Sequence, residues 1–267
     1  MASSATVFKS AIGLVKRRCF GLIIGNEMQM KTSEITLKQL LLSLPLCATL
    51  AVLNYSTGEL LAADAPAGDL VPLEVKLPPP AFKGTPKDIQ LSSYVEPLSD
   101  KPRPPMMVPS GLKNLAPGSK LTCSDKNATA STLQKIVDGD KEATDESIIF
   151  LRKGTQWVQV DLGSPAEVFA ILIWHAHNSA KVYHDIIVQA ADDPDFIENV
   201  RTLYNNDQDN TSGLGVGTDR EYFETHEGRL INAKGVKARY LRFYSKGSTE
   251  SALNEYTEIE VYGRLAK

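Results

Sequence analysis

The C-terminal part of the chain is predicted to be all-β, an antiparallel β-sandwich of the jelly-roll type. Two observations predict this fold. Short apolar runs interrupted by turn residues follow one another after Gly111, and no amphipathic helix of useful length lies between them. With 267 residues, of which 42% are hydrophobic, the chain can bury a sizeable core.

About six strands are expected in this region. The run "WVQVDLG" alternates strictly, which places Val158, Val160 and Leu162 on one face of a strand and Trp157 on the other. The run "FAILIWHA" is almost continuously apolar, which is typical of a strand covered on both faces. The expected strands are residues 157–163, 169–176, 185–191, 200–205, 238–245 and 257–264.

Residues 1–65 are predicted to be an N-terminal extension and a signal peptide. Two lysines in "MKTSEITLKQ" precede an uncharged stretch from Leu40 to Leu53, and "LLAADAPAG" supplies the small residues of a cleavage region. The uncharged stretch is short for a membrane span, which needs about 20 residues, and an uncleaved anchor is the alternative. The residues before Met28 or Met30 are either an upstream extension or part of a long basic region.

Residues 66–111 are predicted to be a proline-rich linker. Eleven of the fifteen prolines lie between Pro66 and Pro109. Because proline fixes its own torsion and lacks an N–H group, we expect this segment to form neither a ladder nor a helix and to run as an extended stalk. The alternative is that part of it lies against the folded domain through the apolar residues of "AFKG" and "MMVP".

The charge of the chain argues against a nucleic-acid partner, and the spacing of its cysteines argues against a zinc site. The 29 basic and 32 acidic side chains give a net charge of -3, so no field is present to attract a polyanion, and nucleic acid is not expected as a partner. Cys19, Cys47 and Cys123 are not spaced for zinc. Cys123 is expected to remain unpaired.

Residues 112–264 resemble a known family, with residues 265–267 as a tail. Six segments in order resemble a discoidin domain, also called coagulation factor 5/8 type C, of the galactose-binding-like superfamily, and the whole chain is similar to bacterial secreted discoidin-domain proteins. The segments are "KNLAPGSKLTCS", "KIVDGD", "WVQVDLGSPAEVFAILIWH", "VYHDIIVQAADDPDF", "ARYLRFYS" and "TEIEVYG". The resemblance implies binding, through loops at one end of the sandwich, to glycans, phospholipid head groups or protein, and many bacterial relatives are carbohydrate-binding modules of family 32 type.

The segment "KIVDGDKEAT" is a candidate calcium loop. Two aspartates around a glycine can supply the oxygen ligands that calcium requires. The resemblance implies a structural calcium here, although Thr144 falls one residue later than the family spacing. The implied ligands are Lys135, Asp138, Asp140, Thr144 and Glu258. The alternative is an ordinary turn, with Glu258 and Glu260 on the solvent face of a strand whose Ile259 and Val261 point inward.

The segment "IWHAHNSAKVYH" is a candidate glycan site. It holds three of the four histidines, but no fourth ligand is spaced to complete a zinc site. Glycan recognition uses an aromatic face and fixed polar groups, while Trp174 is assigned to the core. The glycan candidates are Arg152, His175, His177, Asn178 and Tyr183. The alternative is that the histidines are half-exposed residues without a ligand.

The segment "NNDQDNTSGLGVG", residues 205–217, has two remaining interpretations. A nucleotide loop is excluded because the glycines do not open a helix in a βαβ unit. A complete EF-hand is excluded because Val216 stands where the bidentate glutamate belongs. The favoured interpretation is a turn closed by its own side chains. The alternative is a second, weaker calcium site at Asn205, Asp207 and Asp209.

No catalytic motif appears in a suitable context, so the chain is not expected to be an enzyme. The leading hypothesis is a carbohydrate-binding module that is secreted or held in the periplasm or cell envelope. The alternative is an adhesive or structural module that binds an envelope protein. Lipid binding ranks third because no apolar loop tip with basic neighbours is evident, and membrane contact is expected only through an uncleaved N-terminal segment.

Overall fold

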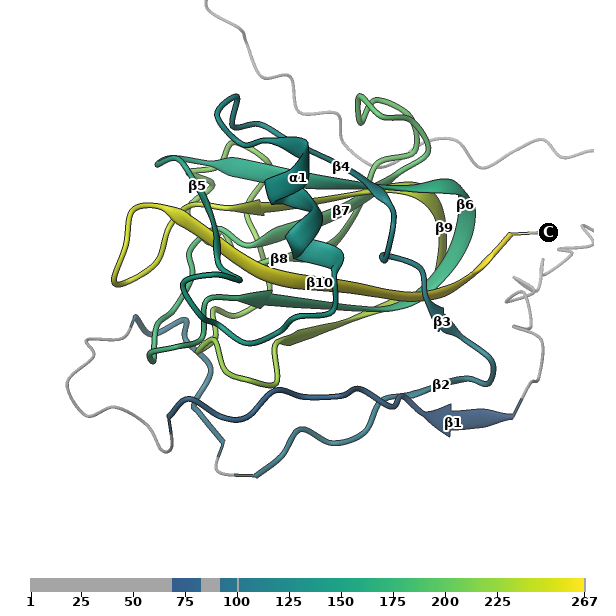
Figure 1. The fold of residues 1–267 in the computed structure, drawn as a ribbon, viewed down its shortest axis with the longest axis horizontal. Coiled ribbons are helices and arrows are strands. Elements are labelled where there is room, and N and C mark those ends of the chain that lie inside the picture. The colour runs from purple at the N-terminus through teal and green to yellow at the C-terminus, as the bar shows by residue number, and fades with distance from the viewer. Residues whose placement is uncertain (1–68, 83–91, 100, 267) are drawn as a thin grey trace, which may run out of the picture. The chain divides into compact units, whose positions relative to one another are not determined.

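The computed structural model describes residues 69–82, 92–99 and 101–266 (Figure 1). The predicted signal peptide lies outside the described residues. Within the described part, no helix is both long enough and apolar enough to cross a membrane.

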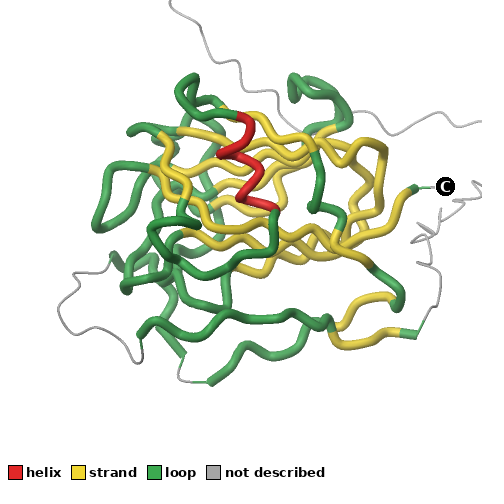
Figure 2. The backbone as a smooth tube through the Cα atoms, in the orientation of Figure 1, coloured by secondary structure: helices red, strands yellow, loops and turns green. Residues whose placement is uncertain are grey.

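The described part is built almost entirely from strands and loops (Figure 2). The helical elements are α1 (Ala130–Leu133) and the 3₁₀ helix η1 (Gln134–Val137). The strands are β1 (Leu70–Pro72), β2 (Met107–Pro109), β3 (Lys113–Asn114), β4 (Lys120–Cys123), β5 (Ile149–Leu151), β6 (Gln156–His175), β7 (Ile187–Ala191), β8 (Arg201–Asn205), β9 (Arg229–Ser245) and β10 (Asn254–Leu265). All six predicted strand regions are confirmed as strand.

The sandwich forms because β6 and β9 are long enough to belong to both of its layers. Their pairing is interrupted between Asp161 and Ala166. On one side of this break, β6 and β9 pair with β4 and β7, and β7 pairs with β8. On the other side, β6 pairs with β10, which also pairs with β3 and β5. All of these strand pairs are antiparallel, so the predicted antiparallel sandwich is confirmed.

The two expected strands at 157–163 and 169–176 are therefore one bent strand, β6. Gly163 and Pro165 read as a turn in the sequence, and Gly163 adopts a φ of +78° at the bend. Pairing with β9 nevertheless resumes at Ala166, which lies opposite Ala238. The prediction of two separate strands was wrong because local turn residues mark a bend here and not an end.

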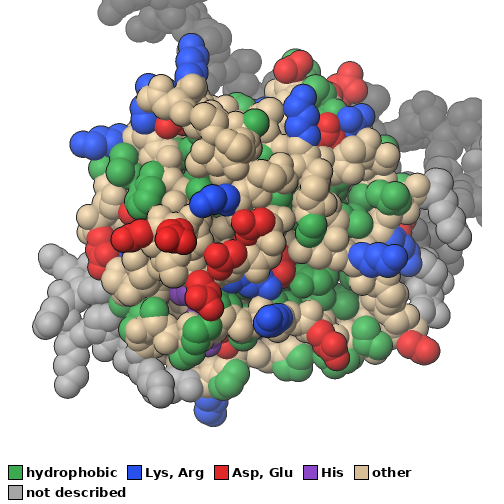
Figure 3. Space-filling view, in the orientation of Figure 1, with side chains coloured by type: hydrophobic (Ala, Val, Ile, Leu, Met, Phe, Trp, Pro, Cys, Tyr) green, Lys and Arg blue, Asp and Glu red, His purple; other side chains and the backbone are tan. Residues whose placement is uncertain are grey.

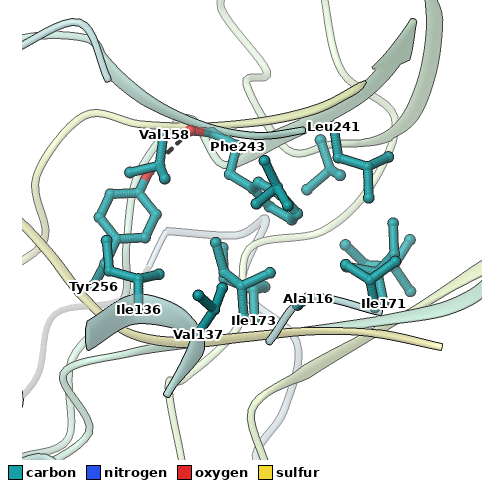
Figure 4. Packing of buried hydrophobic residues seen from close by; sticks show 14 of the residues in the cluster. Ala116, Ile136, Val137, Val158, Ile171, Ile173, Leu241, Phe243 and Tyr256 are labelled. Carbon is teal, nitrogen blue, oxygen red and sulfur yellow. Dashed lines mark hydrogen bonds between the residues drawn. The ribbon is translucent and has the colours of Figure 1, made fainter. Parts of the chain in front are cut away.

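The core lies between the two layers (Figure 4). Val158 and Val160 from one layer are fully buried, as are Ile171 and Ile173 from the other. The predicted alternation is thus confirmed. Trp174 is also fully buried but faces away from this cluster, which confirms that the apolar run of β6 is covered on both faces.

The proline-rich segment is not a free stalk. We call its described residues, 69–82, 92–99 and 101–110, the proline arm. Strand β1 pairs with β2 in an antiparallel ladder, so the prediction that this segment forms no ladder was wrong. Pro72 and Pro109 stand at the ends of these strands, where a missing N–H group is tolerated.

The proline arm is fixed to the sandwich chiefly through arginines of the domain. Arg229 holds the carboxylate of Glu96 with both Nη atoms, at 3.1 and 2.8 Å. Arg220 Nη2 donates to the carbonyl oxygens of Ser93 and Val95, each at 3.1 Å. Proline removes backbone donors but leaves carbonyl acceptors, and arginine supplies donors that match them.

We predict that Arg229→Ala lowers the free energy of unfolding by about 2–4 kcal/mol, because it removes a two-bonded ion pair and the packing of the guanidinium against two tyrosine rings. The centroids of the Tyr204 and Tyr222 rings lie 4.9 and 4.7 Å from Arg229 Cζ. Urea denaturation measures the effect. The control is Lys237→Ala, which removes a largely exposed lysine and should change stability by less than about 0.5 kcal/mol. Equal effects of the two substitutions would contradict a structural role for the arm contact.

Candidate functional site

Several loops gather at the end of the sandwich where β6 finishes and β10 begins, and we call this region the loop end (Figure 1). Asn254 connects two of these loops by hydrogen bonds. Its Nδ2 donates to the carbonyl oxygens of Arg152 and Gly154 at 2.6 and 2.9 Å. Its Oδ1 accepts from the Ser245 hydroxyl at 2.7 Å and from the Gly247 N–H at 2.9 Å. The loop end comprises residues 124–128, 150–155, 176–186 and 246–253.

Arg152 is an exposed residue of the loop end that is held rigidly. Its Nε donates to Asp125 Oδ1 and its backbone N–H to Asp125 Oδ2, both at 2.8 Å. The side chain of Arg152 is 56% exposed, whereas that of Asp125 is only 4% exposed. The N–H groups of Asn127 and Arg152 hold the pKa of Asp125 below its usual range. The guanidinium is therefore anchored at Nε, and its Nη groups have no hydrogen bond among the described residues.

Phe150 lies in β5, and Arg152 directly follows the last residue of that strand. It is 51% exposed, although its neighbours Ile149 and Leu151 are buried in the core. Sequence reasoning did not single out Phe150. The alternation of "IFL" followed by "RK" was the available signal, but the run is too short to show which face is exposed.

Three of the predicted glycan residues are buried. His175, His177 and Tyr183 are 0%, 2% and 1% exposed, so none of them offers a surface to a sugar, and this part of the prediction was wrong. The alternative of half-exposed strand histidines was also wrong for His175 and His177. Asn178, by contrast, is exposed. Of the five predicted residues, Arg152 and Asn178 remain accessible.

The buried residues instead support the loop end from beneath. His175 stacks on the ring of Tyr183 with centroids 4.5 Å apart, and its Nδ1 lies 2.9 Å from Glu224 Oε2. The hydroxyl of Tyr183 donates to Glu255 Oε2 at 2.6 Å, and Lys181 Nζ lies 3.1 Å from the same oxygen. Burial, and then the contact with Glu255, raise the pKa of Tyr183, so its hydroxyl keeps its proton and donates.

The histidines do not converge on a common metal position. His177 Nε2 lies 2.8 Å from the carbonyl oxygen of Lys141, and His184 Nδ1 lies 3.0 Å from Glu221 Oε1. With His175 facing Glu224, each ring contacts a different partner. This arrangement gives no support to a zinc site.

The candidate calcium loop lies against β10. The N–H of Gly139 donates to Glu258 Oε1 at 3.2 Å, and the N–H of Asp140 donates to Asp138 Oδ1 at 2.9 Å. The structure thus brings Glu258 to the Asp138–Asp140 turn, although these residues are far apart in the sequence. Figure 3 shows acidic side chains gathered on the face of the molecule seen there.

Glu258 and Glu260 are not on a solvent face. Glu258 is fully buried and Glu260 is 5% exposed, so the alternative that placed them in water was wrong. Glu258 Oε2 has no hydrogen-bond partner in the described part. Burial, and then the nearby carboxylates of Glu260 and Asp138, raise the pKa of Glu258 to about 9. A cation at this position would satisfy the orphaned oxygen and restore the charged form.

The remaining implied calcium ligands contact other groups. Lys135 Nζ donates to the carbonyl oxygen of Glu146 at 2.7 Å. The carbonyl oxygen of Lys135 is therefore the only atom of this residue that remains a candidate calcium ligand. The Thr144 hydroxyl lies 3.0 Å from that of Ser147. The structure therefore brings Asp138 and Glu258 together but gives no support to Thr144.

The loop at residues 205–217 is closed by its own side chains, as the favoured interpretation predicts. The N–H groups of Thr211 and Ser212 donate to Asp207 at 3.1 and 2.9 Å, and Asn205 Nδ2 donates to the Gly215 carbonyl at 3.0 Å. Gly217 packs so closely that a Cβ there would lie 2.3 Å from the Asn205 carbonyl oxygen.

Carboxylate oxygens of Asp185, Asp207 and Asp209 do lie within 4.8 Å of one another. Backbone and hydroxyl donors already contact these groups, including the Thr211 hydroxyl at 2.7 Å from Asp185 Oδ2. A metal ion at the second predicted site, formed by Asn205, Asp207 and Asp209, would thus also lie near Asp185. It would have to displace hydrogen bonds that close the loop.

The chain matches no family model and no curated protein at a significant level. It is similar to several solved structures. Chitosan-binding module 1 of a chitosanase/glucanase from Paenibacillus sp. IK-5 is 21% identical, with a TM-score of 0.40, over 57% of this chain and 99% of that module. The family 32 carbohydrate-binding module of AlyQ, in complex with 4,5-unsaturated mannuronic acid, is 19% identical, with a TM-score of 0.37, over 53% of this chain and 92% of that one.

A third similar structure is the family 89 glycoside hydrolase from Clostridium perfringens in complex with GlcNAc-alpha-1,4-galactose. It is 20% identical, with a TM-score of 0.40, over 57% of this chain. The match spans only 15% of the length of that hydrolase.

We predict that Glu258→Gln raises stability at pH 8 in the absence of divalent cations. The folded-state pKa of Glu258 is raised to about 9, above an unfolded value of about 4.3. Between these values the wild-type protein must therefore take up a proton on Glu258 when it folds, and its stability falls as the pH rises through this window. Glutamine keeps the acceptor for Gly139 and needs no proton. Urea denaturation of both proteins in chelator should show similar stability near pH 4 and a more stable variant at pH 8. Parallel pH profiles would contradict the assignment.

Proposed function

We propose that this chain is a non-catalytic module that binds carbohydrate at the loop end and is exported to the cell envelope or outside the cell. The observation that carries the proposal is the Arg152 guanidinium, which is exposed on one side and clamped by the buried carboxylate of Asp125 on the other. A donor fork that is already fixed loses little conformational entropy when a ligand binds.

The chemistry around Arg152 suits a sugar. Sugar hydroxyls accept hydrogen bonds from the free Nη groups, and an aromatic ring packs against the apolar face of a pyranose. Phe150, two positions before the arginine in the chain, supplies an exposed ring, and the exposed amide of Asn178, on another loop of the loop end, offers both a donor and an acceptor. Export rests on the sequence pattern of residues 40–65 alone.

We expect Arg152→Ala and Phe150→Ala each to weaken glycan binding by roughly tenfold or more, the effect of losing one good contact to a charged donor or a stacked ring. A glycan array with the full chain, in calcium, identifies the ligand, and calorimetry then gives the affinities. The matched control is Ile197→Ala, which truncates another largely exposed apolar side chain, in the β7–β8 loop at 79% exposure.

Two outcomes would overturn this proposal. One is that the wild-type chain binds no saccharide on the array. The other is that all three variants bind with equal affinity. Capture of an envelope protein that survives excess free sugar, but is lost on Phe150→Ala, would instead favour the adhesive module.

We further propose that a structural calcium binds at the 135–144 loop. The donor set supports this assignment, because the buried Oε2 of Glu258 lacks a hydrogen-bond partner among the described residues. Burial, and then the carboxylates of Glu260 and Asp138, raise the pKa of Glu258. Carboxylate and carbonyl oxygens are the ligands that calcium prefers. In this proposal the side chains of Asp138 and Glu258 and the carbonyls of Lys135 and Asp140 hold the ion, which fixes the loop to β10.

We expect calcium, at about 100 times its dissociation constant, to raise the free energy of unfolding by about 2.7 kcal/mol, and chelator to reverse the gain. Asp138→Ala should abolish the response to calcium. The combined change Asp207→Ala and Asp209→Ala should retain it, even if that variant is less stable overall. Thermal scans with and without calcium measure both effects. A response lost only in the second variant would move the calcium to the 205–217 loop.

A further inference from the structure

The proline arm and the domain line an open pocket of about 600 Å³, which we call the arm pocket. Phe82, Ser99, Lys101 and Arg103 line it from the arm, and Thr225 and His226 line it from the segment before β9. The loop-end residues Phe150, Arg152 and Asn178 are not part of its lining. Since half of its wall lies outside residues 112–264, the arm pocket is a feature that the sandwich alone does not possess.

The walls of the arm pocket are fixed in position. The Arg229 fork on Glu96 closes one side. On another side Arg103 Nη1 donates to the carbonyl oxygens of Glu227 and Gly228 at 3.1 and 2.8 Å, and its backbone N–H donates to the Glu227 carboxylate at 3.2 Å. Prolines in the lining restrict the arm backbone further. The cavity is thus formed before a ligand arrives, and its volume falls within the range of small-molecule sites.

Among the described residues, the lining carries more cationic than anionic side chains. The Glu96 carboxylate is held by the Arg229 guanidinium, and the Glu227 carboxylate accepts the backbone N–H of Arg103. Lys101 is exposed and has no ion-pair partner among the described residues. The described lining thus has three cationic side chains, those of Lys101, Arg103 and Arg229, and two carboxylates. The exposed ammonium of Lys101 is suited to bind carboxylate or phosphate as a point charge.

The lining also offers apolar surface beside this cation. Phe82 and the prolines of the lining add flat apolar surfaces. Arg229 Nε and the Tyr222 hydroxyl, which have no hydrogen bond within the described part of the chain, are buried and do not face the open space of the pocket. The pocket therefore combines a cation and an apolar wall.

We propose that the arm pocket is a second binding site, which takes a sugar that carries a carboxylate. Lys101 binds the carboxylate, Ser99 binds a hydroxyl, and Phe82 packs on the apolar face of the ring. The choice of a sugar over another small carboxylate rests on the proposed function of the loop end. The preference for an acidic ligand rests on the charges of the pocket alone.

The test is calorimetric titration of the full chain with glucuronic, galacturonic and mannuronic acids, each compared with its neutral parent sugar. At least one acid should bind more tightly than its parent. Lys101→Gln should weaken that acid by roughly tenfold. The matched control, Lys120→Gln, removes an exposed lysine from β4 outside the pocket and should leave the affinity unchanged. Backbone amide shifts of Thr225 and His226 on titration provide a second readout that needs no variant.

The outcomes separate this proposal from that of the loop end. Acid binding that falls with Lys101→Gln and persists in Arg152→Ala supports the arm pocket, even if the loop end binds nothing. Acid binding that is lost in Arg152→Ala and kept in Lys101→Gln overturns the arm pocket and leaves the proposed function standing. The arm pocket is also overturned if no acid binds more tightly than its parent, or if Thr225 and His226 do not respond.

Discussion

The buried ion pair between Lys141 and Glu260 is the contact on which the surroundings of β10 depend. The Nζ and Oε1 atoms lie 2.7 Å apart, and the two side chains are only 9% and 7% exposed. Lys141 Nζ also donates to the carbonyl oxygen of Lys76 in the proline arm at 2.8 Å and lies 5.1 Å from the centroid of the Trp174 ring. One ammonium therefore joins the candidate calcium loop, strand β10, the proline arm and the outer face of β6. Because removal of either charge would leave the other buried and unpaired, this junction tolerates little change.

The alternation of apolar and polar residues predicted the strands. The same alternation could not show which site residues are buried, and this is where the prediction of the site failed. Alternation places Val158 and Val160 inward, but it gives no information about what covers the opposite face. His175 and Tyr183 were predicted to bind a glycan because glycan recognition uses an aromatic face and fixed polar groups. Their burial depends on Glu224 and Glu255, which come from distant parts of the chain. Arg152 was another glycan candidate and is exposed, while its anchor Asp125 has no local signal beyond the short "SDKN" turn.

The proline arm shows the same limit of local reasoning. Its composition correctly restricts the backbone, since proline lacks a donor and resists regular structure over long stretches. Whether such a segment packs on the domain depends on donors in the domain that reach its hydrogen-bond acceptors. Here those donors are the side chains of Arg220 and Arg229. Nothing in residues 66–111 indicates that these arginines lie within reach. The acidic chemistry of Glu258 was likewise evident, but its burial became clear only when the 138–142 segment was found to cover β10.

The position of β10 in the chain has a consequence for the order of assembly. This strand follows every other described strand in sequence, yet it pairs with β3, β5 and β6. During synthesis, the edge of β6 that pairs with β10 must therefore wait for a strand that is made after it. Pairings between residues so far apart carry a large loop-closure cost and form slowly. The nascent chain thus presents the apolar strand β6 to its surroundings until β10 has been made and pairs with it.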